Sequence, residues 1–159
     1  MKLEISTEIE IAAPPERVWA ILLDFSAHPE WNPFVRSISG LPEPGARLRV
    51  FVKPEGGRGM TFRPKVLVAS ASRELRWLGR LLLPGLFDGE HYFQLAAVGS
   101  GRTRFVHGER FSGILVGLAR SGLEAGTRAG FVAMNEALKA RAERHGGQQP
   151  SDPARSQGQ

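Results

Sequence analysis

The chain opens with an alternation of apolar and polar positions that predicts a β-strand. From Glu4 to Ile11, three isoleucines and a threonine share one parity, while serine and glutamate occupy the other. Successive side chains of a strand point to opposite faces, so this pattern is typical of a half-buried strand. Pro14-Pro15 then starts a helix, because proline suits the first helical turn. Val18, Ile21 and Leu22 follow at helical spacing.

The middle of the chain is expected to form one more short helix and then a series of strands. Pro29 and Pro33 bracket the helix, so it can only be short. Strand-like segments follow at residues 34–39, 47–53, 60–70, 75–77, 91–98 and 102–112. Gly99-Ser100-Gly101 predicts a hairpin between the last two segments. Residues 81–89 are expected to form an irregular link.

The hydrophobic period becomes helical after Gly113. Phe131, Met134, Leu138 and Ala142 form one stripe, which predicts a long helix that ends near residue 145. Beyond it, residues 146–159 contain no large apolar side chain, so we expect a disordered tail there. The remaining residues 1–145 are expected to form a single domain.

The order of these elements indicates an α+β fold. It runs from one strand through two short helices and about six strands to a long helix. A sheet of antiparallel strands needs its apolar face covered, and the C-terminal helix is the element long enough to cover it.

Eight short strings, taken in order, resemble the SRPBCC superfamily, which includes START, Bet v 1 and polyketide cyclase/dehydrase-like proteins. They are Pro14-Pro15-Glu16-Arg17-Val18-Trp19, Trp31-Asn32-Pro33-Phe34, Phe62-Arg63-Pro64, Glu74-Leu75-Arg76-Trp77, Gly89-Glu90-His91-Tyr92-Phe93, Thr103-Arg104-Phe105, Glu109-Arg110-Phe111-Ser112-Gly113 and Asn135-Glu136-Ala137-Leu138-Lys139. The resemblance extends over about residues 3 to 145. It implies a helix-grip fold, in which a curved antiparallel sheet of about six or seven strands wraps around the C-terminal helix and leaves a ligand cavity between them. Members bind lipids, sterols, polyketides or hormones, and some are enzymes, so the resemblance does not identify a ligand.

The more apolar parity of the strands is expected to face inward. It carries Leu48, Val50, Val52, Met60, Phe62, Pro64, Val66, Leu75, Trp77, Phe93, Leu95, Phe105 and Phe111. The chain has a formal charge of +5, and between residues 36 and 80 ten Lys or Arg stand against three Glu. Most of these basic residues lie on the opposite parity. We therefore expect a basic convex face, which is either a solvated surface or a contact for an acidic partner.

Three polar residues share the inward parity of the last two strands and are the catalytic candidates. They are His91, His107 and Glu109. The loop at residues 99–101 places His91 opposite Glu109, and Phe93 opposite His107. Because a buried carboxylate is costly unless it has a partner, the group either forms a structural hydrogen bond, anchors a ligand or performs acid–base catalysis. No third residue indicates an oxyanion or substrate role, and we expect no metal site.

The expected ligand contacts combine this polar group with aromatic residues. They are Trp31, Phe34, Phe62, Trp77, His91, Phe93, Phe105, His107, Glu109 and Phe131. Glycines 113, 117, 122, 126 and 130 of the last helical region either leave room for a cavity or allow close backbone approach. The apolar run at residues 81–87 is expected to be a lid over the cavity or a packed loop.

These features predict a carrier or sensor that binds a small hydrophobic molecule, such as a lipid or a polyketide-like compound, in an internal cavity. One alternative is a cyclase or dehydratase that uses His/Glu acid–base chemistry. Another is a protein-interaction module that uses the basic convex face. We expect no cofactor, no nucleic-acid partner and no stable membrane insertion, and a monomer with a dimer as the alternative.

Cysteine usage and the first residues bear on the compartment. The chain has no cysteine, which excludes disulfides and thiolate metal sites. Its first residues run directly into a strand pattern without the features of a secretory signal. We therefore expect a cytoplasmic protein. No stretch approaches the roughly 20 apolar residues of a membrane-spanning helix.

Overall fold

The computed structural model describes residues 1–81 and 83–144, with only the backbone described at residues 119–121 and 123. Its elements are β1 (Lys2–Ile11), α1 (Pro15–Leu23), the 3-10 helix η1 (Phe25–Ala27), α2 (His28–Trp31), β2 (Val35–Ser39), β3 (Arg49–Val52), β4 (Met60–Phe62), β5 (Lys65–Ser70), β6 (Glu74–Leu81), β7 (Phe87–Ala97), β8 (Thr103–Ser112) and α3 (Val116–Arg144). This order confirms the predicted α+β, helix-grip fold. The expected tail at residues 146–159 lies outside the described residues, and the single domain over 1–145 stays a prediction.

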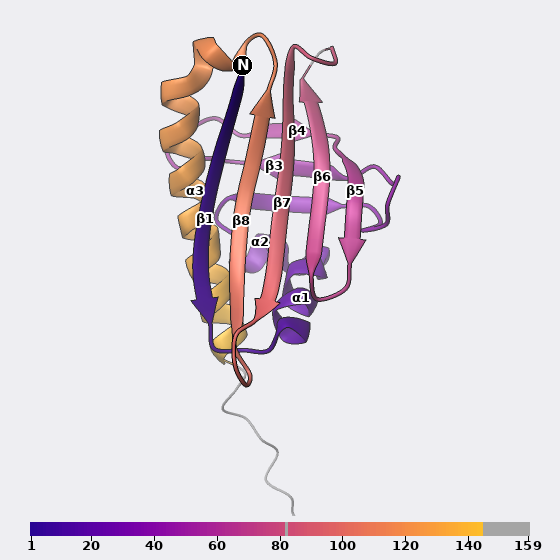
Figure 1. Ribbon diagram of the computed structural model, residues 1–159, viewed down its shortest axis with the longest axis vertical. Helices are drawn as coiled ribbons and strands as arrows, with labels where there is room; N and C mark the ends of the chain where they lie inside the picture. The colour runs from indigo at the N-terminus through magenta and orange to yellow at the C-terminus, as the bar shows by residue number, and fades with distance from the viewer. Residues whose placement is uncertain (82, 145–159) are drawn as a thin grey trace, which may run out of the picture.

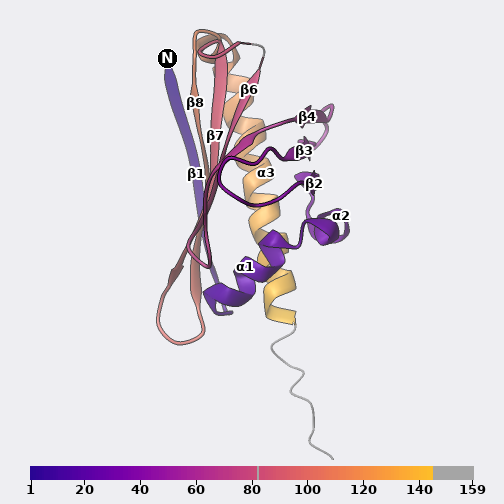
Figure 2. The same cartoon turned by 90° about the vertical axis from the view of Figure 1, so that its right-hand side faces the viewer.

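The strands form two antiparallel sheets that face each other. The larger sheet has the order β1-β8-β7-β6-β5, and the smaller has the order β2-β3-β4. In Figure 1 the smaller sheet runs across behind the larger one, and Figure 2 shows the two sheets on opposite sides of the molecule. Backbone hydrogen bonds from Leu48 to Pro64 and from Val66 to Ala46 connect them. The two sheets are therefore one curved wall with a sharp bend.

The long helix closes one side of the space between the sheets. Helix α3 packs against β1 and β8, and it also contacts α1 and α2 (Figure 2). The predicted stripe of Phe131, Met134, Leu138 and Ala142 is buried in this contact. Hydrophobic burial on one helical face thus holds the C-terminal helix against the sheet.

Two predicted segments differ from the structure. The segment at residues 60–70 is divided into β4 and β5, which belong to different sheets. The division falls at Pro64, which has no N–H group to donate to a strand ladder. The link expected at residues 81–89 is shorter than predicted, because β6 and β7 pair as far as Leu81 and Phe87, and residues 83–86 form a turn.

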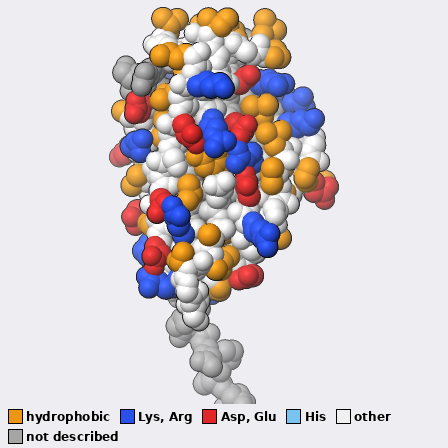
Figure 3. Space-filling view, in the orientation of Figure 1, with side chains coloured by type: hydrophobic (Ala, Val, Ile, Leu, Met, Phe, Trp, Pro, Cys, Tyr) orange, Lys and Arg blue, Asp and Glu red, His pale blue; other side chains and the backbone are white. Residues whose placement is uncertain are grey.

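Charges on the outer face of the larger sheet are largely paired. Arg76 contacts Glu74 and Glu90, while Arg110 contacts Glu4 and Glu90. Figure 3 shows basic and acidic side chains interspersed over this face. The outer surface of the larger sheet is therefore mixed in charge, and the predicted basic excess is not seen on this part of the convex face. The Arg110–Glu4 pair is about half exposed and contributes little to stability.

One glycine of α3 allows the smaller sheet to approach the helix. The ring of Phe34, which precedes β2, occupies the position where a Cβ on Gly130 would lie. The Phe34 ring also packs edge-on against Phe131, with ring centroids 5.6 Å apart. Gly130 therefore serves close packing and leaves no empty space. In contrast, a Cβ added at Gly126 meets no atom within 4 Å.

This contrast predicts opposite effects of alanine at two positions of one helix. Gly130→Ala should destabilise the protein by about 1–3 kcal/mol, because the added methyl group displaces a buried ring. Gly126→Ala should stabilise it by about 0.5–1 kcal/mol, through helix propensity alone. Urea unfolding of both variants measures the difference. Equal stabilisation by the two substitutions would contradict the packing of Phe34 against Gly130.

Candidate functional site

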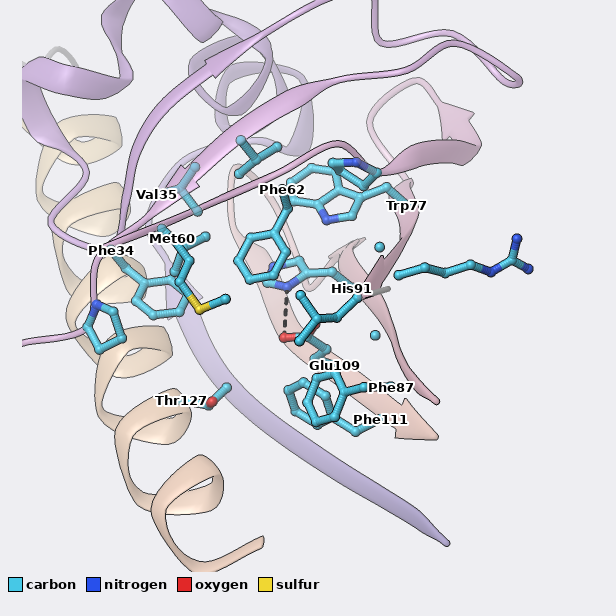
Figure 4. Close-up of a pocket in the computed structure, with 18 of the residues that line it drawn as sticks. Phe34, Val35, Met60, Phe62, Trp77, Phe87, His91, Glu109, Phe111 and Thr127 are labelled. Carbon is cyan, nitrogen blue, oxygen red and sulfur yellow. Dashed lines mark hydrogen bonds and ion pairs between the residues drawn. The ribbon is translucent and has the colours of Figure 1, made fainter. Parts of the chain in front are cut away.

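A cavity of about 420 Å³ lies between the two sheets. Its walls are mainly apolar side chains of β2, β3, β4, β6, β7 and β8, and Thr127 reaches it from α3 (Figure 4). Phe34, Phe62, Trp77, Phe87 and Phe111 supply aromatic surface around it. The apolar parity of the strands faces this space, as the alternation in the sequence predicts.

Exposed side chains mark the opening of the cavity. Met60 of β4 and Leu81 at the end of β6 line the cavity and remain 47% and 37% exposed. Arg58 and Arg80 line the same region and are exposed. Arg80 lies 3.7 Å from a carboxylate oxygen of Asp88. The opening therefore combines apolar surface with positive charge. The apolar run at residues 81–87, expected to be either a lid or a packed loop, contributes Leu81 and Phe87 to the cavity wall.

A histidine and a glutamate form the polar part of the inner wall. His91 of β7 lies directly opposite Glu109 of β8, which confirms the predicted register. The Nδ1 atom of His91 is 3.4 Å from Glu109 Oε2 (Figure 4). Trp77 stacks on the imidazole with ring centroids 5.0 Å apart. A Cβ at Gly89 would overlap Glu109 Oε1, so glycine leaves room for the carboxylate.

A second histidine, His107, contacts His91 on the side away from the cavity. His107 is fully buried, and its Nε2 atom lies 2.9 Å from His91 Nε2. Its Nδ1 atom is 3.0 Å from Asn135 Oδ1 on α3. The Asn135 amide donates to the hydroxyl of Thr7 on β1, at 3.0 Å. Burial, followed by the charge of His91, holds the pKa of His107 well below its ordinary value.

A separate network positions Phe34 in the cavity wall. The Oδ1 atom of Asn32 accepts hydrogen bonds from the backbone N–H groups of Phe34 and Val35, at 3.0 and 2.9 Å. His28 contacts the Asn32 amide through Nδ1 and the carbonyl oxygen of Leu22 through Nε2. Burial lowers the pKa of His28. The buried Asn32 is thus the residue of the string Trp31-Asn32-Pro33-Phe34 that holds the backbone of Phe34 in place.

The structure places five of the ten expected ligand contacts on the cavity wall. These are Phe34, Phe62, Trp77, His91 and Glu109. The other five, Trp31, Phe93, Phe105, His107 and Phe131, are not among the described residues that line the cavity. Direct contact of the five wall residues with a ligand stays a prediction.

The residues away from the wall have other neighbours. Trp31 packs against His28, with ring centroids 4.9 Å apart. Phe93 stacks on Phe105 within the core. Phe131 covers His107, with ring centroids 3.8 Å apart. Trp31 and Phe131 lie on helices α2 and α3, while Phe93 lies on β7 in the buried core.

Sequence patterns missed several residues that shape the site. Asn135 follows Phe131 by one helical turn, and Thr7 shares the inward parity of β1, so both signals were present in the sequence. Arg58 lies in a glycine-rich turn, where no strand or helix period indicates which way a side chain points. Within residues 1–81 and 83–144, no three His, Cys, Asp or Glu side chains are arranged so that they could hold a metal ion.

Comparison with known proteins identifies the family. The family model described as "Polyketide cyclase / dehydrase and lipid transport" matches residues 2–143. The chain belongs to this family. No curated protein matches the sequence. The resemblance to polyketide cyclase/dehydrase-like proteins is therefore confirmed at the level of the family.

Solved structures share the fold of this polyketide cyclase/dehydrase family member. The Zhui aromatase/cyclase from Streptomyces sp. R1128 is 22% identical, with a TM-score of 0.73 over 91% of this chain and 95% of that chain. A START superfamily protein from Mycobacterium smegmatis is also 22% identical, with a TM-score of 0.68 over 89% and 97%. A norcoclaurine synthase from Thalictrum flavum is 14% identical, with a TM-score of 0.70 over 92% and 97%. At these identities the likeness shows the fold alone.

The description of the family covers polyketide cyclases, dehydrases and lipid transport. Among the described residues, no helix is both long enough and apolar enough to cross a membrane.

Buried His28 and His107 predict that stability falls in mild acid. The pKa of each lies below its ordinary value of 6.5 in the folded protein, so the unfolded chain takes up a proton at these positions more readily. Their contribution is therefore complete above pH 6.5 and is lost as the pH falls below it, by at most about 1.4 kcal/mol per pH unit for each histidine.

Urea unfolding between pH 7.5 and 5.5 measures this loss. The His107→Gln variant, which retains His28, should show a smaller loss than the wild type. A free energy of unfolding that does not change over this range would contradict the neutral, buried state of the two histidines.

Proposed function

We propose that this protein binds a small hydrophobic molecule in the cavity between its sheets, as a carrier or sensor. The observation that carries the proposal is a cavity of about 420 Å³ with mainly apolar walls and an open mouth. A volume of this size is within the range of small-molecule sites. When a ligand displaces water from the apolar wall of such a cavity, the free energy of the system falls.

The shape of the wall favours a ligand with a flat apolar body and one polar group. Phe62, Phe87 and Phe111 lie around the cavity and present aromatic surface (Figure 4). The polar pair of His91 and Glu109 lies on one side of this surface. A ligand that buries an aromatic body there places a single polar group against the pair.

A cyclase or dehydratase is the second candidate, and the contact between His91 and Glu109 is the observation that favours it. An imidazole and a carboxylate at the wall of an apolar cavity can donate and accept protons from a bound carbonyl compound. The family description includes cyclases and dehydrases. Catalysis would require Glu109 for turnover of a linear poly-β-ketone substrate, and binding alone would give no product.

The carrier proposal predicts that filling the cavity abolishes binding without unfolding the protein. Gly79 of β6 lines the cavity, and a Cβ there meets only ordinary contacts, at 3.8 Å from the Gly89 carbonyl oxygen and 4.0 Å from Pro64. The Gly79→Phe ring can therefore extend into the cavity. We expect the affinity for naphthalene, followed by its fluorescence, to fall by at least about tenfold.

The matched control is Leu78→Phe, which adds an aromatic ring to the opposite face of the same strand. This variant should bind naphthalene as the wild type does, and both variants should keep a cooperative thermal transition. Naphthalene binding that survives in Gly79→Phe, or that is absent from the wild type, would overturn the proposed binding site. Native mass spectrometry of freshly purified protein then identifies any small molecule that it carries.

A further inference from the structure

The hydrogen bonds behind the cavity wall determine where the protons of the two histidines lie. The Thr7 hydroxyl donates to the carbonyl oxygen of His107, at 3.1 Å. Its oxygen therefore accepts from the Asn135 amide. This places Asn135 Oδ1 against His107 Nδ1. Because Oδ1 can only accept, His107 Nδ1 must carry the proton.

The state of His107 then determines the state of His91. His107 is fully buried, and among the described residues no carboxylate is hydrogen-bonded to it. Its imidazole is therefore neutral, with a bare Nε2 atom. His91 must supply the proton for the 2.9 Å contact between the two Nε2 atoms. Thr7, Asn135 and His107 together are positioning residues, which keep His91 Nε2 protonated.

The remaining nitrogen of His91 faces the carboxylate in the cavity. If His91 were neutral and Glu109 ionised, a bare Nδ1 atom would face a carboxylate oxygen, and two acceptors would lie 3.4 Å apart. A hydrogen bond between the two side chains therefore needs one further proton, which they share either as imidazolium and carboxylate or as imidazole and carboxylic acid. The net charge of the pair is zero in both arrangements.

This pair retains unused hydrogen-bonding capacity. The His91–Glu109 distance of 3.4 Å is longer than a usual N–H···O bond. No described residue donates a hydrogen bond to Glu109 Oε1, which lies over Gly89. On the side that faces the cavity, the oxygen atoms of Glu109 therefore lack a strong donor, and the shared proton lacks a close acceptor.

We propose that the His91–Glu109 pair, held in one proton state by His107, Asn135 and Thr7, is a binding site for a neutral hydroxyl group of an apolar ligand. A hydroxyl group satisfies both partners, because it donates to Glu109 and accepts from His91 Nδ1. This inference rests on the proposed binding function and specifies the ligand class.

Other polar groups fit the pair less well. An ether or ketone oxygen only accepts, so it leaves the carboxylate without a donor. An ammonium group only donates, and it would add a positive charge to a pair of zero net charge, in a cavity that Arg58 and Arg80 also line. The locked proton state is therefore what separates a hydroxyl ligand from an amine.

Four probes of similar shape test the inference by titration at pH 7: naphthalene, 2-naphthol, 2-methoxynaphthalene and 2-naphthylmethylamine. We expect the wild type to bind 2-naphthol at least about tenfold more tightly than the methoxy or amine probe, because a site with unpaired polar groups discriminates against analogues that leave them unpaired. Naphthalene reports on the cavity itself.

Two variants separate the roles of the residues. Glu109→Gln should lower the ratio of 2-naphthol to 2-methoxynaphthalene affinity by at least about fivefold. Asn135→Leu removes the side-chain acceptor at His107 Nδ1 and leaves a backbone contact to Phe131, so the preference for a proton on Nδ1 weakens. His107 can then donate through Nε2, and His91 can pair with Glu109 without the extra proton. The site then carries a net negative charge, and the amine probe should gain at least about fivefold relative to 2-naphthol. A purely structural asparagine would not change this selectivity.

The control is Glu90→Gln, which alters a neighbouring carboxylate on the outer face of β7 and should keep the wild-type ratios. If naphthalene binds but 2-naphthol has no advantage in the wild type, or if Glu109→Gln keeps that advantage, the hydroxyl inference is wrong and the cavity proposal stands. If naphthalene itself does not bind, the proposed function fails. Should Asn135→Leu fail to fold, the Glu109→Gln result still decides the outcome.

Discussion

The hydrogen bond between His107 and Asn135 connects the long helix to the sheet at the point where the cavity begins. His107 lies on β8, and Asn135 lies on α3 one turn after Phe131, whose ring covers the imidazole. A buried imidazole without partners would cost several kcal/mol. Helix α3 must therefore keep a fixed rotation about its axis and a fixed position along β8. This constraint also orients His91, which is the first polar side chain inside the cavity.

A second constraint keeps the two sheets apart on the other side of the cavity. Gly130 admits the Phe34 ring, and the buried Asn32 holds the backbone of Phe34 and Val35. The smaller sheet is thus anchored to α3 at its base, while its far edge at Met60 stays open. Tight packing at one end and an open edge at the other leave the apolar walls separated. The same fold therefore provides both a solid core and a space for a ligand.

Local patterns in the sequence were sufficient for most of the fold. Alternation identified the inward faces of the strands, and the loop at residues 99–101 fixed the register that places His91 opposite Glu109. The division at Pro64 was not predicted, because alternation continues through residues that belong to two different sheets. Only half of the expected ligand contacts line the cavity, for a similar reason. Parity distinguishes inward from outward, but it cannot distinguish a wall residue such as Phe62 from a core residue such as Phe105, which depends on the distance between layers.

The account depends most on the proton positions of His107 and His91, which nitrogen chemical shifts report directly. A long-range ¹⁵N–¹H correlation spectrum of the histidine side chains at pH 7 would assign them. We expect the pattern of a neutral ring protonated at Nδ1 for His107, and a protonated Nε2 for His91. A His107 ring protonated at Nε2 would contradict the proposed hydroxyl site. His107 would then donate to His91 Nε2, and His91 could pair with Glu109 through Nδ1 without an extra proton.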